Sequence, residues 1–124
     1  MNDLYVYNAR LVRVVDGDTI IADVDLGFDT WKRTNIRFYG IDAYESRTRD
    51  LEEKELGIKA RELLIDLFLN SNGNFVLKSM GLDKYGRSLG IVLIPNEEAE
   101  GMSIDANQYL VNEGLAVPYF GGKR

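Results

Sequence analysis

The sequence predicts an α+β fold, in which five short strands form a small β-barrel and two helices pack against it. Three observations lead to this prediction: period-two alternation of apolar residues in the first third of the chain, one amphipathic helical segment in the middle, and the order of these segments. With 124 residues, of which 45% are hydrophobic and 28% charged, the chain has the size and composition of one globular domain over residues 1–124.

Turn-forming residues separate the five predicted strands. The first strand covers residues 4–15, is rich in Val, Tyr and Leu, and ends at an Asp-Gly-Asp turn. Residues 19–26 alternate between apolar and polar side chains, which is typical of a strand with one buried face. A Gly-Phe-Asp turn then predicts a hairpin to a third strand over residues 31–41. The fourth and fifth strands are expected over residues 74–80 and 87–94.

The helix predicted over residues 52–69 presents one apolar stripe, formed by Leu56, Ala60, Leu63, Leu64 and Leu67. It is expected to stop in the Asn-Ser-Asn-Gly segment that follows. A shorter helix is expected over residues 104–112, with Ser103 as its N-cap and Gly114 as its terminator. Five strands with a helix between the third and the fourth follow the order of an OB-fold barrel.

Composition limits the chemistry that the chain can perform. The chain contains no Cys and no His, which excludes disulfides, thiolate or imidazole metal ligands, and Ser-His or Cys-His catalysis. An enzyme built from this sequence therefore uses carboxylates, Arg, Lys, Tyr and hydroxyl groups, helped by a hard cation bound through oxygen. The net charge of −5 argues weakly against a nucleic-acid partner, but residues 31–49 carry five basic side chains against two acidic ones.

Nothing in the sequence predicts a membrane partner. No stretch approaches the roughly 20 apolar residues that span a bilayer, and residues 1–16 lack the apolar run and cleavage site of a secretory signal. We therefore expect a cytoplasmic protein, unless the sequence is already that of a mature secreted form.

Two carboxylate clusters follow predicted turns, with Asp16 and Asp18 in one and Asp42 and Glu45 in the other. If the second and third strands pair as a hairpin centred near residue 30, Asp18 and Asp42 approach each other. Like charges at such distances need a shared proton, a basic neighbour or a bound cation such as Ca²⁺ or Mg²⁺. The alternative is an ordinary Asp-Gly-Asp turn that binds nothing.

Two arginines on predicted strands are candidates for binding a phosphate. Arg37 is in the third strand, and Arg87 begins the fifth strand. A guanidinium group offers two parallel donors to the oxygens of a phosphate. Together with a cation and the spare carboxylate of Glu45, the pair has the composition of a site for phosphodiester hydrolysis. Each arginine also has a simpler interpretation, since Arg37 could pair with an acid on a neighbouring strand and Arg87 could solvate a turn.

Four sequence blocks resemble the staphylococcal nuclease, or thermonuclease, family. They are VVDGDT at residues 14–19, IRFYGIDAYE at 36–45, DKYGR at 83–87 and LVNEGLA at 110–116. Their order and approximate spacing also agree with the family, and the likeness covers residues 10–119. The resemblance implies an OB-fold with a Ca²⁺-dependent phosphodiesterase activity on DNA and RNA, which breaks the bond to the 5′ oxygen and leaves 3′-phosphate ends.

The resemblance also implies which residues hold the metal and the water. Asp18 and Asp42 match the carboxylates that ligate Ca²⁺, and the main-chain carbonyl of Ala43 matches a third ligand. Glu45 matches the carboxylate that orients or activates the attacking water. The identity of the metal ion stays open, because Mg²⁺ or Mn²⁺ could replace Ca²⁺ inside a cell.

The same resemblance assigns the residues that hold the nucleic acid. Arg37 and Arg87 match the pair that grips the scissile phosphate, and Lys84 and Tyr85 match residues that touch a neighbouring phosphate. Tyr119 is one residue out of register with an aromatic that stacks on a base, so a core or anchoring role is an equal alternative.

The chain departs from the family pattern in three ways. The usual DTPE reads DAYE here, so a threonine and a proline are lost; the chain is acidic; and it stops at Arg124, so the family's last helix is expected to be absent. The competing hypothesis is a non-catalytic OB-fold module that binds nucleic acid or protein. All five positions of the expected catalytic set hold the required residue type, which favours the enzyme. Oligomeric state and the choice between DNA and RNA stay open.

Overall fold

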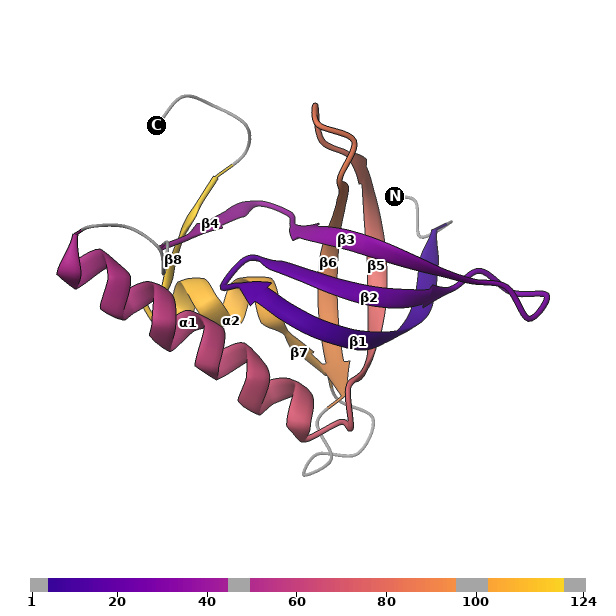
Figure 1. Cartoon of the computed structure of the whole chain (residues 1–124), viewed down its shortest axis with the longest axis horizontal. Coiled ribbons are helices and arrows are strands. Elements are labelled where there is room, and N and C mark those ends of the chain that lie inside the picture. Colours follow the sequence, from indigo (N-terminus) through magenta and orange to yellow (C-terminus); the bar gives the residue numbers. More distant parts are fainter. Residues whose placement is uncertain (1–4, 45–49, 96–102, 120–124) are drawn as a thin grey trace.

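The computed structural model of the chain describes residues 5–44, 50–95 and 103–119. It contains eight strands and two helices in the described parts of the chain (Figure 1). In chain order these are β1 (Val6–Asp16), β2 (Thr19–Asp25), β3 (Trp31–Phe38), β4 (Ile41–Ala43), α1 (Leu51–Leu69), β5 (Asn74–Leu82), β6 (Ser88–Pro95), β7 (Ser103–Asp105), α2 (Ala106–Asn112) and β8 (Ala116–Pro118).

Five of the strands close into a barrel. The sheet runs in the order β3-β2-β1-β5-β6 with antiparallel neighbours, and a parallel pairing of β3 with β6 joins its two edges. β7 extends the β6 edge, while β4 and β8 form a separate two-stranded sheet beside the barrel. The predicted α+β class, with a five-stranded OB-fold barrel and two helices, is confirmed.

The alternation of apolar residues decides which side of each barrel strand faces inward. On β2, Ile20, Ala22 and Val24 are buried, whereas the residues between them are partly exposed. The largest fully buried side chains of the core are Phe38, Phe68, Ile20, Ile36, Leu64, Ile94, Leu110 and Val92. Sequence alternation therefore fixes one face of the sheet as core and leaves the other face for surface chemistry.

α1 lies diagonally across one end of the barrel (Figure 1). Its N-terminus is capped by Asp50, whose side chain accepts hydrogen bonds from the amides of the second and third helical residues. The buried face holds Gly57, Ala60, Leu64, Leu67 and Phe68, and most of the predicted stripe is part of it. The helix ends where predicted, with Asn72 and Gly73 at positive φ. No helix in the described ranges is long and apolar enough to cross a membrane.

Two predicted boundaries are wrong, and both corrections concern the surroundings of the site. The third strand was expected to continue to residue 41, but it ends at Phe38 because Gly40, at φ +79°, turns the chain into β4. The short helix was expected to begin at residue 104 with Ser103 as its cap, but residues 103–105 form β7 and the helix begins at Ala106. Asp105 is the cap and accepts a hydrogen bond from the amide of Gln108 at 3.1 Å. Gly114, at φ +74°, terminates this helix as predicted.

Candidate functional site

The β2–β3 hairpin register corrects the predicted route by which Asp18 and Asp42 meet. Thr19 pairs with Arg37, so the hairpin is centred on residue 28 rather than 30. Asp18 therefore faces Phe38, whose amide donates to the Asp18 carbonyl at 2.8 Å. Asp42 lies outside this ladder. Gly40, at φ +79°, separates β3 from β4, and β4 lies beside the start of β2, where the Ala43 amide donates to Asp18.

Close packing of small residues holds the Asp-Gly-Asp turn against both α1 and β4. A Cβ atom at Gly17 would lie 2.6 Å from the Cβ of Ala60 in α1 and 3.0 Å from the Cβ of Ala43 in β4. Both distances are shorter than a van der Waals contact, so only glycine permits this approach. The turn that carries Asp18 is thereby placed directly beside the strand that carries Asp42.

The Asp18 carboxylate is fixed from three directions. Its Oδ2 atom accepts a hydrogen bond from the amide of Ala43 at 2.9 Å, and its Oδ1 atom accepts one from the Thr19 hydroxyl at 3.0 Å. The Arg37 Nη1 atom also lies 2.9 Å from Oδ2. These contacts come from β2, β3 and β4, so the position of this carboxylate depends on the complete fold.

Arg37 lies between the two aspartates. Its Nη1 atom is near Asp18, and its Nη2 atom lies 3.5 Å from Asp42 Oδ1, with all three side chains about 13–14% exposed. The Nη1 contact falls short of hydrogen-bond geometry, so this buried nitrogen has no hydrogen-bond partner among the described residues. Arg37 therefore pairs with neighbouring acids, as its simpler interpretation expected. The guanidinium group also keeps N–H donors that are not used in hydrogen bonds within the described part of the chain.

Arg87 is held by an aspartate of its own turn. Its Nε atom lies 2.7 Å from Asp83 Oδ2, while Asp83 Oδ1 accepts from the amides of Tyr85 and Arg87 at 2.8 Å each. Burial raises the pKa of the Asp83 carboxyl, but these hydrogen bonds from Arg87 and Tyr85 outweigh it and hold the pKa below the ordinary value of 3.8. Asp83 therefore remains ionised and orients the guanidinium.

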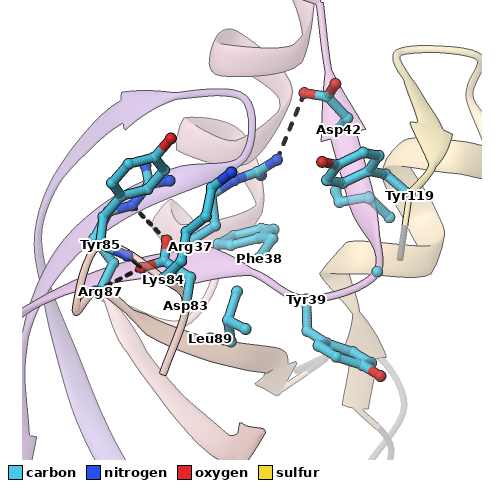
Figure 2. A pocket seen from close by; sticks show the side chains of 12 residues that line it. Arg37, Phe38, Tyr39, Asp42, Asp83, Lys84, Tyr85, Arg87, Leu89 and Tyr119 are labelled. Carbon is cyan, nitrogen blue, oxygen red and sulfur yellow. Dashed lines mark hydrogen bonds and ion pairs between the residues drawn. The ribbon is translucent and has the colours of Figure 1, made fainter. Parts of the chain in front are cut away.

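Two hollows meet at these arginines, and Figure 2 shows the larger one. It has a volume of about 460 Å³, and the smaller one has about 270 Å³. Both are lined by Arg37, Asp42 and Arg87. The smaller hollow adds four residues that surround the Asp-Gly-Asp turn: Asp16, Asp18, Thr19 and Ala43. The expected charged residues are therefore brought together at one end of the barrel.

The predicted nucleotide-contacting residues line the larger hollow. Lys84 Nζ and Arg87 Cζ lie 5.3 and 5.7 Å from the centre of the Tyr85 ring. Tyr119 is on the opposite side, next to Asp42 in Figure 2. Its amide also donates to the carbonyl of Gly40 at 2.8 Å, so it both anchors the chain end of β8 and lines the hollow.

The donor set fits a hard cation. Carboxylate oxygens of Asp18 and Asp42 flank the smaller hollow together with the main chain of Ala43, and oxygen ligands completed by water are those that Ca²⁺ and Mg²⁺ take. Within the described residues there is no cluster of three or more acidic, His or Cys side chains able to hold a metal by themselves. A cation bound here would therefore share its shell with water or a bound oxyanion.

Glu45, the predicted water-activating residue, lies outside the described residues. The sequence reasoning missed Asn107, which is 5% exposed and connects three backbone groups. Its Nδ2 atom donates to the carbonyls of Tyr39 and Gly90 at 2.8 and 3.0 Å, and its Oδ1 atom accepts from the amide of Val92 at 3.1 Å. A polar residue beside Ala106 on the buried face of a short helix was the available signal.

The roles of Asp83 and Gly17 were missed as well. Asp83 was seen only as part of a motif, although an acid four residues before Arg87 at a Gly-containing turn indicates an ion pair. Gly17 could be read as a turn residue, but its contact with Ala60 joins positions 43 residues apart and leaves no local sequence signal.

Comparison with known proteins agrees with the motif pattern. The chain matches the family described as "Staphylococcal nuclease homologue" over residues 35–124. It is 33% identical over 115 residues to the micrococcal nuclease of Shigella flexneri, covering 91% of this chain and 59% of that protein. It is 30% identical over 107 residues to the thermonuclease of Staphylococcus hyicus, covering 86% of this chain and 56% of that protein.

An uncharacterized endonuclease of Escherichia coli is 31% identical over 112 residues, covering 90% of this chain and 61% of that protein. The chain thus spans less than two thirds of the length of these relatives. The family match nevertheless covers most of this chain, from residue 35 within β3 through β4 and the turn that carries Arg87. The chain therefore belongs to the staphylococcal nuclease homologue family.

Proposed function

We propose that the protein is a metal-dependent nuclease that hydrolyses phosphodiester bonds of DNA or RNA. One observation carries the proposal: Arg37 and Arg87 line the same hollow as the carboxylates of Asp18 and Asp42. A site with two guanidinium groups and two hard oxygen ligands suits an anion and a divalent cation bound side by side. The names of the relatives, micrococcal nuclease and thermonuclease, support the same activity.

Arg37 and Arg87 bind the scissile phosphate in this proposal. The Arg37 guanidinium is held 2.9 Å from Asp18 and 3.5 Å from Asp42 while it lines the smaller hollow, so a phosphate that enters there meets a positive charge already in place. Arg87 presents its two Nη groups to the phosphate because its Nε is held by Asp83. The charge that develops on the phosphorus oxygens is then stabilised by donors that are already oriented, which is the main source of catalysis in such sites.

Asp18, Asp42 and the carbonyl of Ala43 would hold the cation, which we propose is Ca²⁺, with Mg²⁺ or Mn²⁺ as substitutes. When bound, the cation neutralises charge on a phosphate oxygen and lowers the pKa of a bound water. The hydrogen bond from the Ala43 amide to Asp18 keeps one metal-side carboxylate in place before any ligand arrives. Preorganisation of this kind avoids reorganisation during the reaction.

Glu45 is proposed to orient or deprotonate the attacking water, since it follows β4 by two residues and carries the spare carboxylate of the set. Water adds its hydroxyl to phosphorus, the bond from phosphorus to the 5′ oxygen breaks, and the proton from that water ends on the 5′ oxygen. The products are a 3′-phosphate end and a 5′-hydroxyl end.

Lys84, Tyr85 and Tyr119 complete the substrate contacts of the proposal. Lys84 and Tyr85 are both exposed at the rim of the larger hollow, where a cation and an aromatic face suit a neighbouring phosphate and its nucleotide. Tyr119 flanks Asp42 on the other side. The larger hollow, at about 460 Å³, has room for a nucleotide.

The test is cleavage of plasmid DNA, single-stranded DNA and RNA under Ca²⁺, Mg²⁺, Mn²⁺ or EDTA, with identification of the ends produced. We expect cleavage with a divalent cation, none in EDTA, and 3′-phosphate ends. Glu45→Gln is expected to lower turnover by orders of magnitude with an unchanged fold by circular dichroism. Tight binding without cleavage under any cation would instead identify a non-catalytic OB-fold module.

A further inference from the structure

The tip of the β2–β3 hairpin exposes an aromatic side chain on a strained turn. Phe28 is fully exposed, at 102% of its reference area, and Trp31 beside it is 49% exposed. The hairpin extends beyond the rest of the barrel at the end of β3 opposite to β4 (Figure 1). This apolar tip therefore lies far from both the core and the hollows lined by Arg37.

The backbone conformation of the tip disfavours the residues that it holds. Gly27, Phe28 and Asp29 have φ angles of +83°, +55° and +58°, and the turn is closed by a hydrogen bond from the Thr30 amide to the Gly27 carbonyl at 2.9 Å. Two central residues at positive φ favour Asn and Gly, as in a type I′ turn. A phenylalanine there is strained and buries nothing, so neither folding nor packing explains its presence.

A row of side chains on the outer face of β3 connects this tip to the candidate site. Trp31, Arg33, Asn35 and Arg37 alternate along the strand, and alternate residues share one face. Their inward-facing neighbour Ile36 is fully buried, which identifies the row as the outer face. At about 3.3 Å per residue, the row extends roughly 20 Å from Arg37 to Trp31.

Two further arginines come from β1 on the same face. Arg10 pairs in register with Asp23, which pairs with Arg33, and Arg13 pairs with Ile21, which pairs with Asn35. Cross-strand partners share a face. Arg10 and Arg13 are exposed, and the Arg10 guanidinium lies 5.6 Å from the centre of the Trp31 ring. Cations thus lie along the face, and aromatic surface lies at its tip end.

The acidic side chains of this face have partners within the protein. Asp23 is bound by Arg33 through two hydrogen bonds of 3.0 and 3.2 Å, and Asp25 accepts from the amide of Gly27 at 2.8 Å. The hydrogen bonds from Arg33 hold the pKa of Asp23 below its ordinary value. Asp29 adds one more negative charge at the tip, while Lys32 is exposed on the same strand as Arg33.

We propose that Phe28, Trp31, Arg10, Arg13 and Arg33 form a track for a nucleic-acid strand whose scissile phosphate is at Arg37. Exposed arginines suit backbone phosphates, and Trp31 and Phe28 suit stacking of unpaired bases. This inference rests on the proposed function for the location of the cleaved bond, and it extends the bound region about 20 Å beyond the reaction site.

The charge pattern favours a nucleic acid over an apolar protein surface as the partner of the hairpin tip. A polyanion that follows β3 meets a guanidinium from β1 or β3 at each step from Arg13 to Arg10 and Arg33 before it reaches Trp31. Arg33 already has Asp23 as its counter-charge, but an apolar protein partner would desolvate the guanidinium groups of Arg10 and Arg13 without supplying one. The track is a line on one sheet face, which suits a flexible single strand better than a flat partner surface.

The experiment measures how affinity depends on strand length, in EDTA so that no cleavage occurs. We use fluorescently labelled single-stranded DNA of about 4 and about 20 nucleotides, which bracket the usual site size of an OB-fold. For the parent chain we expect the longer strand to bind at least about tenfold more tightly per molecule. Equal affinity for the two lengths would overturn the proposal.

Three substitutions test the track directly. Trp31→Ala and Phe28→Asn are each expected to remove most of the affinity gained with length, about five- to tenfold. Arg13→Ala is expected to reduce the slope of log affinity against log salt for the long strand by about 0.7. The matched controls are Arg61→Ala and Leu69→Asn, exposed residues of α1, which should keep the length and salt dependence of the parent.

Phe28→Asn also separates binding from folding. Asparagine adopts positive φ more readily than phenylalanine, so the melting temperature should stay the same or rise while affinity for the long strand falls. A loss of melting temperature together with full length dependence would identify a structural role and overturn the proposal. Binding to anionic phospholipid vesicles that depends on Phe28, without any length dependence on DNA, would overturn it in favour of a membrane partner.

Failure of the track and failure of the proposed function give different results. The length dependence in EDTA reports the track alone. Cleavage of the long strand in Ca²⁺ reports the site alone. A chain that cleaves DNA but shows no length dependence refutes the track, whereas one with length dependence and no cleavage under any cation refutes the nuclease.

Discussion

The carboxylate of Asp18 accepts a hydrogen bond from the backbone amide of Ala43 at 2.9 Å, across 25 residues of sequence. This bond joins the start of β2 to β4, the strand that carries Asp42. It is one of the contacts that hold the two aspartates together, since the β2–β3 ladder alone does not. The geometry of the site therefore depends on an acceptor at residue 18.

Substitutions at Asp18 should separate the effect of its hydrogen-bond acceptor on stability from the effect of its negative charge on cleavage. Asp18→Asn keeps an oxygen for the Ala43 amide, whereas Asp18→Ala leaves that partly buried amide without its partner. We expect Asp18→Ala to lower the free energy of unfolding by about 1–3 kcal/mol more than Asp18→Asn does. Both should lose most of the divalent-dependent cleavage. Urea denaturation measures the first effect, and equal stability of the two variants would show that the hydrogen bond contributes nothing.

The ion pair between Asp83 and Arg87 predicts a pH dependence of stability. Because the pKa of folded Asp83 is below 3.8, its contribution is fully present above the unfolded pKa and disappears as the pH falls through the folded pKa. The difference in unfolding free energy between the parent and Asp83→Asn should therefore be constant above about pH 5 and shrink below about pH 4. Denaturation of both proteins from pH 2 to pH 6 measures this. A difference that grows on acidification would contradict the assignment.

The same substitution should affect catalysis through Arg87. Asp83→Asn removes the carboxylate that binds the Arg87 Nε atom, so the guanidinium is less well oriented toward a phosphate. We expect kcat to fall by about ten- to a hundredfold at neutral pH, less than on removal of the guanidinium itself. Steady-state cleavage of single-stranded DNA measures the change.

Asn107 is expected to be a stability residue for the turn that leads to Asp42. Asn107→Leu removes the side-chain hydrogen bonds to the Tyr39 and Gly90 carbonyls and from the Val92 amide. We expect a loss of about 2–4 kcal/mol in unfolding free energy. Asn112→Ala, in the same helix but exposed, should cost less than about 0.5 kcal/mol. Similar effects of the two substitutions would argue against this role.

The contact between Gly17 and Ala60 can be tested by a double-mutant cycle. Gly17→Ala forces the new Cβ against Ala60 and should cost about 1–3 kcal/mol, with reduced cleavage because the Asp18 turn moves. Ala60→Gly alone should cost about 1 kcal/mol as a helix glycine. The double variant should be more stable than the sum of the two losses predicts. Strict additivity would mean that the turn relaxes without pushing on α1.

The barrel was predictable because its signals are local. Alternation on residues 19–26, turn residues at each strand end and the stripe of α1 each determine burial within one element, and the structure confirms them. The end of β3 was not predictable in the same way. Tyr39 and Ile41 continue the apolar and aromatic pattern, and the sequence does not show that Gly40 adopts a positive φ or that Ile41 pairs with Pro118 of β8.

The same distinction between local signals and long-range contacts applies to the candidate site. Motif resemblance identified the residues Asp18, Arg37, Asp42 and Arg87, which the structure brings to one end of the barrel. The separate assumption that Asp18 and Asp42 pair across the hairpin gave the wrong hairpin centre, because Asp42 lies beyond the β2–β3 ladder, in β4. Long-range contacts of this kind carry no periodicity that a single sequence displays.

The proposal that two guanidinium groups share one phosphate is tested most directly by conservative arginine substitutions. Arg37→Lys and Arg87→Lys keep the positive charge but lose the paired donors, and Arg61→Lys on α1 is the matched control. The measurement is kcat for single-stranded DNA in Ca²⁺. We expect each site substitution to lower kcat by about a hundredfold or more and the control to match the parent. Losses below about twofold at Arg37 and Arg87 would show that charge alone suffices and would contradict the shared-phosphate site.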